Sequence, residues 1–188
     1  MSKEKDLDDE FRSALSRGDE SAWFAFHQRY TLRLIRYARA IVKDEQLAHD
    51  AVQAIMVGLV RNRTRLEQIQ NLEAYLFSAL RRDLWRMIKQ VQKEAALLVP
   101  LESERNGSSI SLQLADRKLV GTNAEDRDYL HVALSLLNDE QRAVIELRFF
   151  GELTFECIAG VLQLPMGTIV SRYRAGLQLL RHNLEDQA

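Results

Sequence analysis

The stretch from Leu153 to Leu180 constrains the fold most strongly, because a proline divides two apolar patterns of helical spacing. In the first pattern, Thr154 is a typical N-cap residue and apolar residues follow it at helical intervals. Pro165 has no backbone N–H and disfavours helical geometry at Leu164, so the first helix has to end there. A second apolar pattern of the same spacing follows. Together they predict a helix-turn-helix, whose second helix enters the DNA major groove.

Basic residues are concentrated in this predicted hairpin. From Cys157 to Leu184 the chain holds three arginines and no acidic residue, whereas residues 125–188 as a whole hold ten acidic residues against six arginines. A local excess of cations within an acidic region is typical of a surface that contacts phosphates. The alternative reading is a hairpin that only packs against the rest of the protein, since small helical hairpins are common.

The composition indicates an all-α protein. In 188 residues there are only two prolines and eight glycines, and the length suits one large domain or two small ones. Cys157 is the only cysteine, which excludes an internal disulfide and a cysteine metal cluster. The four histidines are scattered without ligand spacing, so we expect neither a metal nor a cofactor. The sequence has no phosphate loop and no nucleophile–base pairing, so it does not indicate an enzyme.

The chain also lacks segments that would direct it to a membrane. Its N-terminus is charged and has no apolar core, unlike a signal peptide, and no stretch approaches the ~20 apolar residues of a membrane span. We therefore expect a cytoplasmic protein.

Two basic stripes occur in the N-terminal half. A predicted helix over residues 29–43 carries five cations and no acid, which suits phosphate contact unless the face is merely solvated. A second helix, capped by Asn71, carries basic residues on one face with aromatic residues near them. Aromatic rings stack with unpaired bases while cations hold phosphates, so this face suits single-stranded nucleic acid. The residues of this second stripe are Arg82, Arg86, Lys89 and Lys93, with Tyr75, Phe77 and Trp85 near them.

Between the two halves the composition changes. Residues 96–124 are rich in serine, glycine and asparagine and read as a flexible linker. The sequence therefore predicts two helical domains, over residues 8–95 and 125–184, joined by this linker.

Two motif sets point to one family. The run LNDEQRAVIELRFFGELTFECIAGVLQLPMGTIVSRYRAGLQLLR resembles region four of bacterial extracytoplasmic-function (ECF) sigma factors. The N-terminal half, with DAVQ and NLEAYLF, resembles their region two. The resemblance covers about residues 9–95 and 125–184, in the family's order.

The resemblance implies a role in transcription initiation without an enzymatic step. Region two would bind the clamp helices of the largest RNA polymerase subunit and read the melted minus-ten element. Region four would bind the flap of the second-largest subunit and read the minus-thirty-five element. Many relatives are held by an anti-sigma factor, which is a further partner to expect. Carried over by position, the polymerase contacts are Asp50, Gln53 and Met56; the minus-ten contacts are Asn71, Tyr75, Ser78, Arg81, Arg82, Arg86 and Lys89; and the minus-thirty-five contacts are Thr168, Ser171, Arg172 and Arg174.

The chain departs from the family pattern at five positions, which are Ala54, Arg82, Gln163, Val170 and Ala175. The last two replace cations of the recognition helix, so minus-thirty-five contacts should be weaker or read another sequence. An autonomous helix-turn-helix regulator is the main alternative, although it has no need of the region-two helices. A scaffold that has lost DNA reading is a third hypothesis.

Overall fold

The computed structural model describes residues 2–42, 44–98 and 133–185, and in these ranges the chain is helical without strands. None of the described helices is both long and apolar enough to span a bilayer. The expected linker lies outside the described residues from position 99 on, and residues 96–98 belong to the preceding helix. The elements are α1 (Ser2–Arg17), α2 (Glu20–Val42), α3 (Glu45–Arg61), the 3-10 helix η1 (Arg63–Gln68), α4 (Leu72–Leu98), α7 (Asp139–Phe149), α8 (Phe155–Leu162) and α9 (Met166–Glu185).

Local capping sets the boundaries of α1 to α4. Gly18, with φ +84°, separates α1 from α2, and the Asp19 carboxylate accepts a hydrogen bond from Ala22 N at 3.0 Å. At the start of α3, Asp44 is the N-cap residue and accepts a hydrogen bond from Leu47 N at 2.9 Å. The expectation of a separate helix over residues 29–43 is wrong, because no breaker interrupts the chain after Asp19 and α2 runs continuously to Val42.

Side chains cap both α7 and α8, and the cap at Thr154 is the one predicted above. Asn138 and Gln141 form a reciprocal capping box at the start of α7, and Thr154 accepts from Cys157 N at 3.2 Å at the start of α8. Such caps satisfy backbone donors that have no partner within the helix. The helix-turn-helix prediction is therefore confirmed in its boundaries.

Gly151 follows the end of α7, at a position where glycine commonly adopts the left-handed conformation. In this structure the next residue, Glu152 (φ 55°), adopts that conformation instead, and Gly151 has a packing role. A Cβ at Gly151 would lie 2.7 Å from the Leu147 carbonyl oxygen and 2.9 Å from a ring carbon of Phe77 in α4. Glycine is thus required for close approach between α4 and the end of α7.

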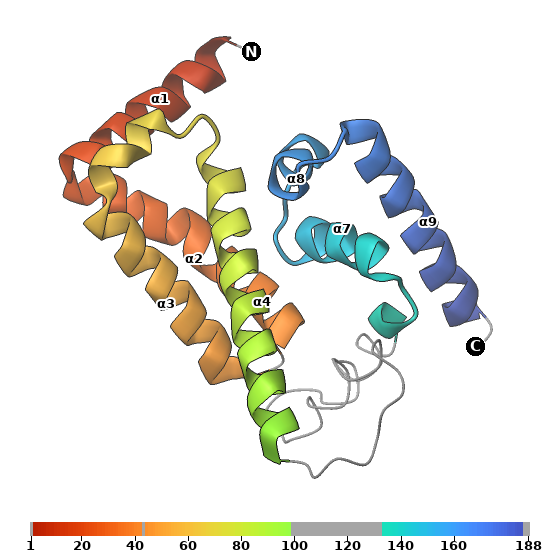
Figure 1. Ribbon diagram of the computed structural model, residues 1–188. Helices are drawn as coiled ribbons and strands as arrows, with labels where there is room; N and C mark the ends of the chain where they lie inside the picture. The colour runs from red at the N-terminus through yellow and green to blue at the C-terminus, as the bar shows by residue number, and fades with distance from the viewer. Residues whose placement is uncertain (1, 43, 99–132, 186–188) are drawn as a thin grey trace.

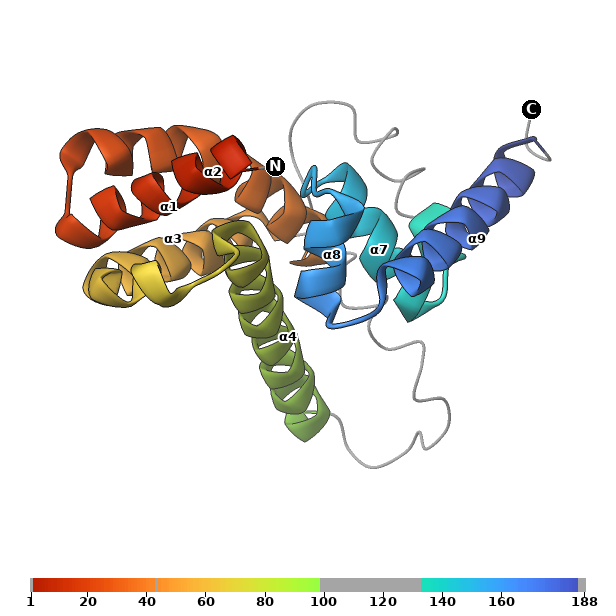
Figure 2. The same ribbon diagram turned by 90° about the horizontal axis from the view of Figure 1, so that it is seen from above.

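The two halves share one hydrophobic core. Helices α1–α4 form one bundle, and α8 packs against α4, with α9 at the outer edge in both views (Figures 1 and 2). Leu76, Phe77 and Leu80 of α4 belong to the same buried cluster as Leu147 and Ile158 of the C-terminal half. The described helices of the N-terminal and C-terminal halves are therefore packed together.

The turn between α8 and α9 contains a strained residue. Gln163 caps α8 in the left-handed conformation, with φ 54° and ψ 45°, where the family pattern has glycine. For a residue with a Cβ this conformation costs roughly 1–2 kcal/mol, whereas glycine adopts it without steric penalty.

We expect Gln163→Gly to raise the free energy of unfolding by about 0.5–1 kcal/mol, because relief of this strain exceeds the added chain entropy. Chemical denaturation monitored by circular dichroism measures the change. Gln178→Gly, at an exposed position inside α9, is the matched control and should lower stability by about 1 kcal/mol. Equal losses in both variants would contradict strain at Gln163.

Candidate nucleic-acid interface

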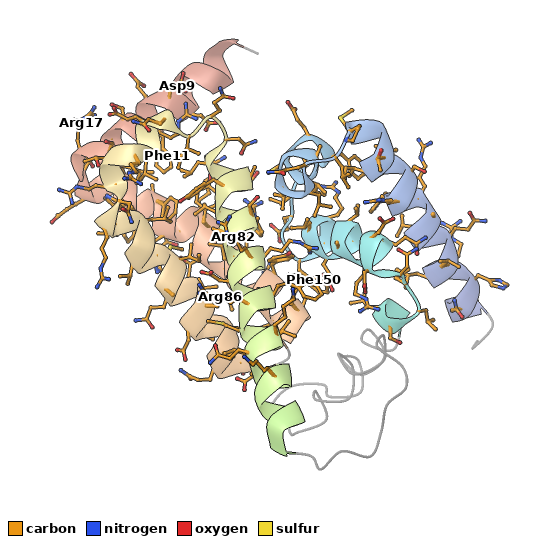
Figure 3. All side chains as sticks on the ribbon, in the orientation of Figure 1. Asp9, Phe11, Arg17, Arg82, Arg86 and Phe150 are labelled. Carbon is orange, nitrogen blue, oxygen red and sulfur yellow. The ribbon has the colours of Figure 1, made fainter. Side chains whose placement is uncertain are left out.

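The basic stripe of α4 is exposed along the helix. Arg82 and Arg86 follow each other along α4 (Figure 3), and Lys89 continues the exposed series. Tyr75 is 45% exposed and Trp85 is 37% exposed, so two aromatic rings accompany the cations at the surface. This combination of accessible rings and cations suits stacking of unpaired bases with phosphate contact.

The hydrophobic residues of α4 divide between the core and the surface. Phe77, expected beside the stripe, is fully buried against Tyr37, with ring centroids 5.4 Å apart. Val91 is exposed, since the distal part of α4 extends past the packed helices (Figure 1). The aromatic face of α4 is therefore formed by Tyr75 and Trp85.

Three other minus-ten candidates are engaged within the protein. Asn71 uses its side-chain oxygen to cap α4, accepting from Ala74 N at 2.8 Å. Ser78 is half-buried and its hydroxyl donates to the Val161 carbonyl of α8 at 3.4 Å. Arg81 is half-buried, with its guanidinium 5.7 Å from the centroid of the Trp85 ring. Ser78 and Arg81 thus face the C-terminal half, whereas Asn71 is exposed and caps its own helix.

The turn before Asn71 depends on a residue that sequence reasoning missed. Arg12 of α1 is buried and donates from Nη1 to the carbonyls of Ile69 and Gln70, the latter at 2.5 Å. It also pairs with Asp9. Only its place in a charged helix was visible in the sequence, and nothing in the pattern distinguished it from a solvated arginine.

The recognition helix α9 presents fewer free groups than the motif suggests. Ser171 and Arg174 are exposed and Thr168 is half-buried. Arg172 has a 23% exposed side chain and forms an ion pair with Glu140 of α7 at 2.6 Å. Among the minus-thirty-five candidates, Arg174 is the cation directed to solvent.

The cations of α2 do not form the expected phosphate-binding face. Arg33 pairs with Glu73 at 2.6 Å, and Arg36 pairs with Glu152 at 2.6 Å. Arg39 lies 3.3 Å from Glu45. The acids come from α3, α4 and the turn after α7, which is why the sequence of α2 alone could not reveal the pairing. Lys43 lies outside the described residues.

Helix α3 presents a mixed surface. Asp50 and Gln53 are exposed, whereas Met56 is half-buried against the core. Val57 and Val60 are 42% and 47% exposed, so this end of the apolar stripe of α3 lies at the surface. An acid, an amide and two exposed valines thus form one accessible side of α3.

A buried carboxyl lies where the two halves meet. Glu146 of α7 is only 7% exposed, and burial raises its pKa to about 7, although the nearby cations of Arg142 and Arg81 act to lower it and Asp139 acts to raise it. Tyr37 of α2 is fully buried in the same place, and burial raises its pKa well above the usual value. Groups from α2, α4 and α7 therefore meet in a partly polar contact.

The fold and these surfaces define a class: an all-helical protein with a helix-turn-helix and a second basic, aromatic helix face. Residues 26–94 match the family model of Sigma-70 region 2, and residues 133–182 match that of Sigma-70, region 4. The chain belongs to the ECF sigma factors, and it is accordingly a non-enzymatic transcription initiation factor.

Several relatives are similar over different lengths. The chain is 46% identical over 52 residues to the ECF RNA polymerase sigma factor RpoE of Cereibacter sphaeroides. The aligned stretch covers 28% of this chain and only 29% of that protein. It is 25% identical over 175 residues to the ECF RNA polymerase sigma factor SigK of Mycobacterium ulcerans, covering 91% of this chain and 90% of that one.

Solved structures share the fold. CnrH in complex with the cytosolic domain of CnrY has a TM-score of 0.63 at 19% identity, covering 96% of this chain and 99% of that chain. RpoE in complex with the anti-sigma factor NepR from Bartonella quintana has a TM-score of 0.60 at 23% identity, covering 86% and 97%. At these identities the likeness shows the fold alone.

We expect Glu146→Gln to raise the unfolding temperature at pH 8 by a few degrees and to have no such effect near pH 4.5. The raised pKa means that the folded protein favours the neutral carboxyl, so its stabilising contribution is full below the ordinary value of 4.5 and is lost as the pH rises through about 7. Glutamine keeps the neutral form at every pH. Differential scanning calorimetry across this range tests the prediction.

Glu156→Gln, at an exposed position in the first turn of α8, is the control and should show no comparable dependence on pH. A Glu146→Gln variant that is less stable than the wild type at pH 8 would mean that the ionised carboxyl is stabilising.

Proposed function

We propose that this chain binds core RNA polymerase and directs it to promoters by reading the minus-ten and minus-thirty-five elements. The observation that carries the proposal is the presence of two separate surfaces in one sigma-family chain: the basic, aromatic face of α4 and the exposed side of α9 with Arg174. A single-stranded element and a duplex element need different surfaces, because unpaired bases stack on rings whereas duplex bases are read in a groove.

The α4 surface suits the melted minus-ten strand. Tyr75 and Trp85 offer exposed rings, and Arg82, Arg86 and Lys89 offer cations along the same helix. Arg82 stands where the family pattern has asparagine. A cation in that position adds an electrostatic contact and changes the hydrogen-bonding groups offered to a base, so we expect the minus-ten preference to differ from that of typical relatives.

The α9 surface suits the minus-thirty-five duplex. Ser171 and Arg174 are accessible, and Thr168 lies at the N-terminal end of the helix, which in helix-turn-helix proteins approaches the base edges. Arg172 reaches DNA only if its ion pair with Glu140 rearranges. With Val170 and Ala175 in place of cations, Arg174 is the principal candidate for a bidentate contact to guanine.

The accessible side of α3 is the proposed polymerase contact. Asp50 and Gln53 supply polar groups, and the neighbouring exposed valines, Val57 and Val60, supply apolar area of the kind that partner proteins cover. The half-buried Met56 supports this surface from the core side.

An anti-sigma factor is proposed as a further partner. The similar RpoE of Bartonella quintana was solved in complex with the anti-sigma factor NepR, and that pairing supports the proposal. The place of action is proposed to be the cytoplasm, where polymerase and promoter DNA meet. The proposed domains are residues 8–95 and 125–184.

The proposed function is tested by mixing the purified chain with core polymerase, analysing the mixture by size exclusion, and transcribing a promoter library. A stable complex that initiates at a defined motif supports the sigma role and supplies the promoter sequence. Absence of a complex, together with binding of duplex DNA by the chain alone, would support an autonomous helix-turn-helix regulator instead.

We expect Asp50→Arg to prevent assembly with core polymerase while the helical circular dichroism spectrum stays normal, because an exposed carboxylate is replaced by a cation in the proposed contact. Glu67→Arg makes the same charge change at another exposed position, in η1, and should leave assembly intact. Normal assembly of Asp50→Arg would remove this residue from the interface.

We expect Arg174→Ala to weaken promoter-specific initiation roughly tenfold without affecting polymerase binding, since a good bidentate base contact contributes about 1–3 kcal/mol of discrimination. Arg181→Ala, an exposed arginine two turns further along α9, is the control and should cost much less. Initiation assays on matched and mutated minus-thirty-five sequences give the readout. An equal loss on both sequences would refute base reading by Arg174.

A further inference from the structure

The turn between η1 and α4 is attached to α1 through one buried cation. Arg12 is 9% exposed, and its Nη1 donates to the backbone carbonyls of two consecutive residues, Ile69 and Gln70. Its Nη2 pairs with the Asp9 carboxylate, three residues earlier on α1. Burial of a guanidinium is costly unless its donors find acceptors, so the two carbonyls and Asp9 make this burial possible. Arg12 therefore fixes the backbone of the turn relative to α1.

The turn leads directly into the proposed minus-ten face. Gln70 and Asn71 are both exposed, and the Asn71 side chain caps α4 by accepting a hydrogen bond from Ala74 N at 2.8 Å. Tyr75, one helical turn further, is 45% exposed. The path of the backbone through the turn thus determines where α4 begins and how the residues at its start are presented.

Close packing does not fix the turn on every side. A cavity of about 230 Å³ borders it, lined among others by Arg12, Gln70 and Asn71. Side chains that border a cavity lack the close contacts that hold residues in a packed core, so the hydrogen bonds of Arg12 have to hold the backbone instead. The neighbouring Ser13 donates to the Glu67 carboxylate of η1 at 3.2 Å, which adds a second contact from α1.

Stability alone does not account for an arginine at this position. Among the described residues, the buried Nε of Arg12 has no hydrogen-bond partner. An unsatisfied buried donor lowers stability, and apolar side chains often replace buried ion pairs without loss. An apolar side chain, however, could not bind the carbonyls of Ile69 and Gln70. The specific contribution of Arg12 is therefore the geometry of the turn.

We propose that Arg12 is a positioning residue for minus-ten recognition, which sets base preference by fixing the turn that presents Asn71 and Tyr75. The proposal rests on the proposed function. Arg12 itself is buried and acts through the turn, without touching DNA. A recognition surface is selective only when neighbouring groups hold its side chains in one geometry, and α1 supplies that support here.

The selectivity is tested with promoters that carry single-base changes in the minus-ten element. Arg12→Met removes the donors and keeps a long side chain, so the ratio of initiation at the preferred element to initiation at the changed elements should fall about tenfold, the size of one base contact. The corresponding ratio for minus-thirty-five changes should stay constant, because α9 lies on the opposite side of the molecule from α1 (Figure 1).

Three further variants make this test specific. Arg12→Lys can still donate to a carbonyl and should recover part of the ratio, and Asp9→Asn, which keeps every donor of Arg12, should lower the ratio less than Arg12→Met. Arg17→Met is the matched control, since Arg17 is exposed at the end of α1 (Figure 3) and donates to Ser13 Oγ at 2.7 Å. A uniform loss of initiation with an unchanged minus-ten ratio in Arg12→Met would indicate a merely structural role and overturn the proposal.

Amide hydrogen exchange of the free protein tests the hold on the turn without polymerase. In Arg12→Met the Ala74 amide, which Asn71 caps, should exchange about tenfold faster than in the wild type. The Cys157 amide, capped in the same way by Thr154 in α8, is the internal reference and should not change. Unchanged exchange at Ala74 would overturn the proposal. If the wild-type chain directs no initiation at all, the proposed function fails, whereas the exchange rates still decide whether Arg12 holds the turn.

Discussion

The contact between Arg33 and the residues that follow α7 fixes how the N-terminal and C-terminal halves are oriented relative to each other. A guanidinium presents several donors in a fixed plane, so one side chain satisfies a carboxylate of α4 and backbone carbonyls that follow α7. The ring of Phe77 lies against the same group, with 5.8 Å between its centroid and the guanidinium carbon. This arrangement requires Gly151, because any side chain there would meet Phe77.

The shared core and the polar contact have different consequences. Burial of Leu147 and Ile158 with the α4 leucines favours association of the halves without specifying orientation, since the hydrophobic effect is non-directional. The ion pairs and carbonyl hydrogen bonds specify one orientation. The protonation state of the buried Glu146 also affects this contact, because burial favours its neutral carboxyl over the ionised form.

Local features were predictable from the sequence, and long-range pairings were not. The caps at Asp44, Asn138 and Thr154 and the proline-directed end of α8 follow from neighbouring residues, and each is present. The partners of the α2 arginines lie far along the chain, so a basic stripe looked like a phosphate surface. Of the α4 candidates, Arg82 and Arg86 are accessible as expected, whereas the packing of α8 over Ser78 depends on tertiary contacts that no local pattern encodes.

The positions of the two tryptophans give the interface an optical signal. Trp85 is partly exposed, and the guanidinium of Arg81 lies over its ring. Arg81 is near the boundary between the halves. Trp23 lies away from that boundary, with its indole N–H donating to the Leu15 carbonyl at 3.1 Å. A rearrangement of Arg81 at this boundary is expected to alter the surroundings of Trp85 and to leave those of Trp23 unchanged. The emission of Trp85 would therefore report on the state of the boundary through Arg81.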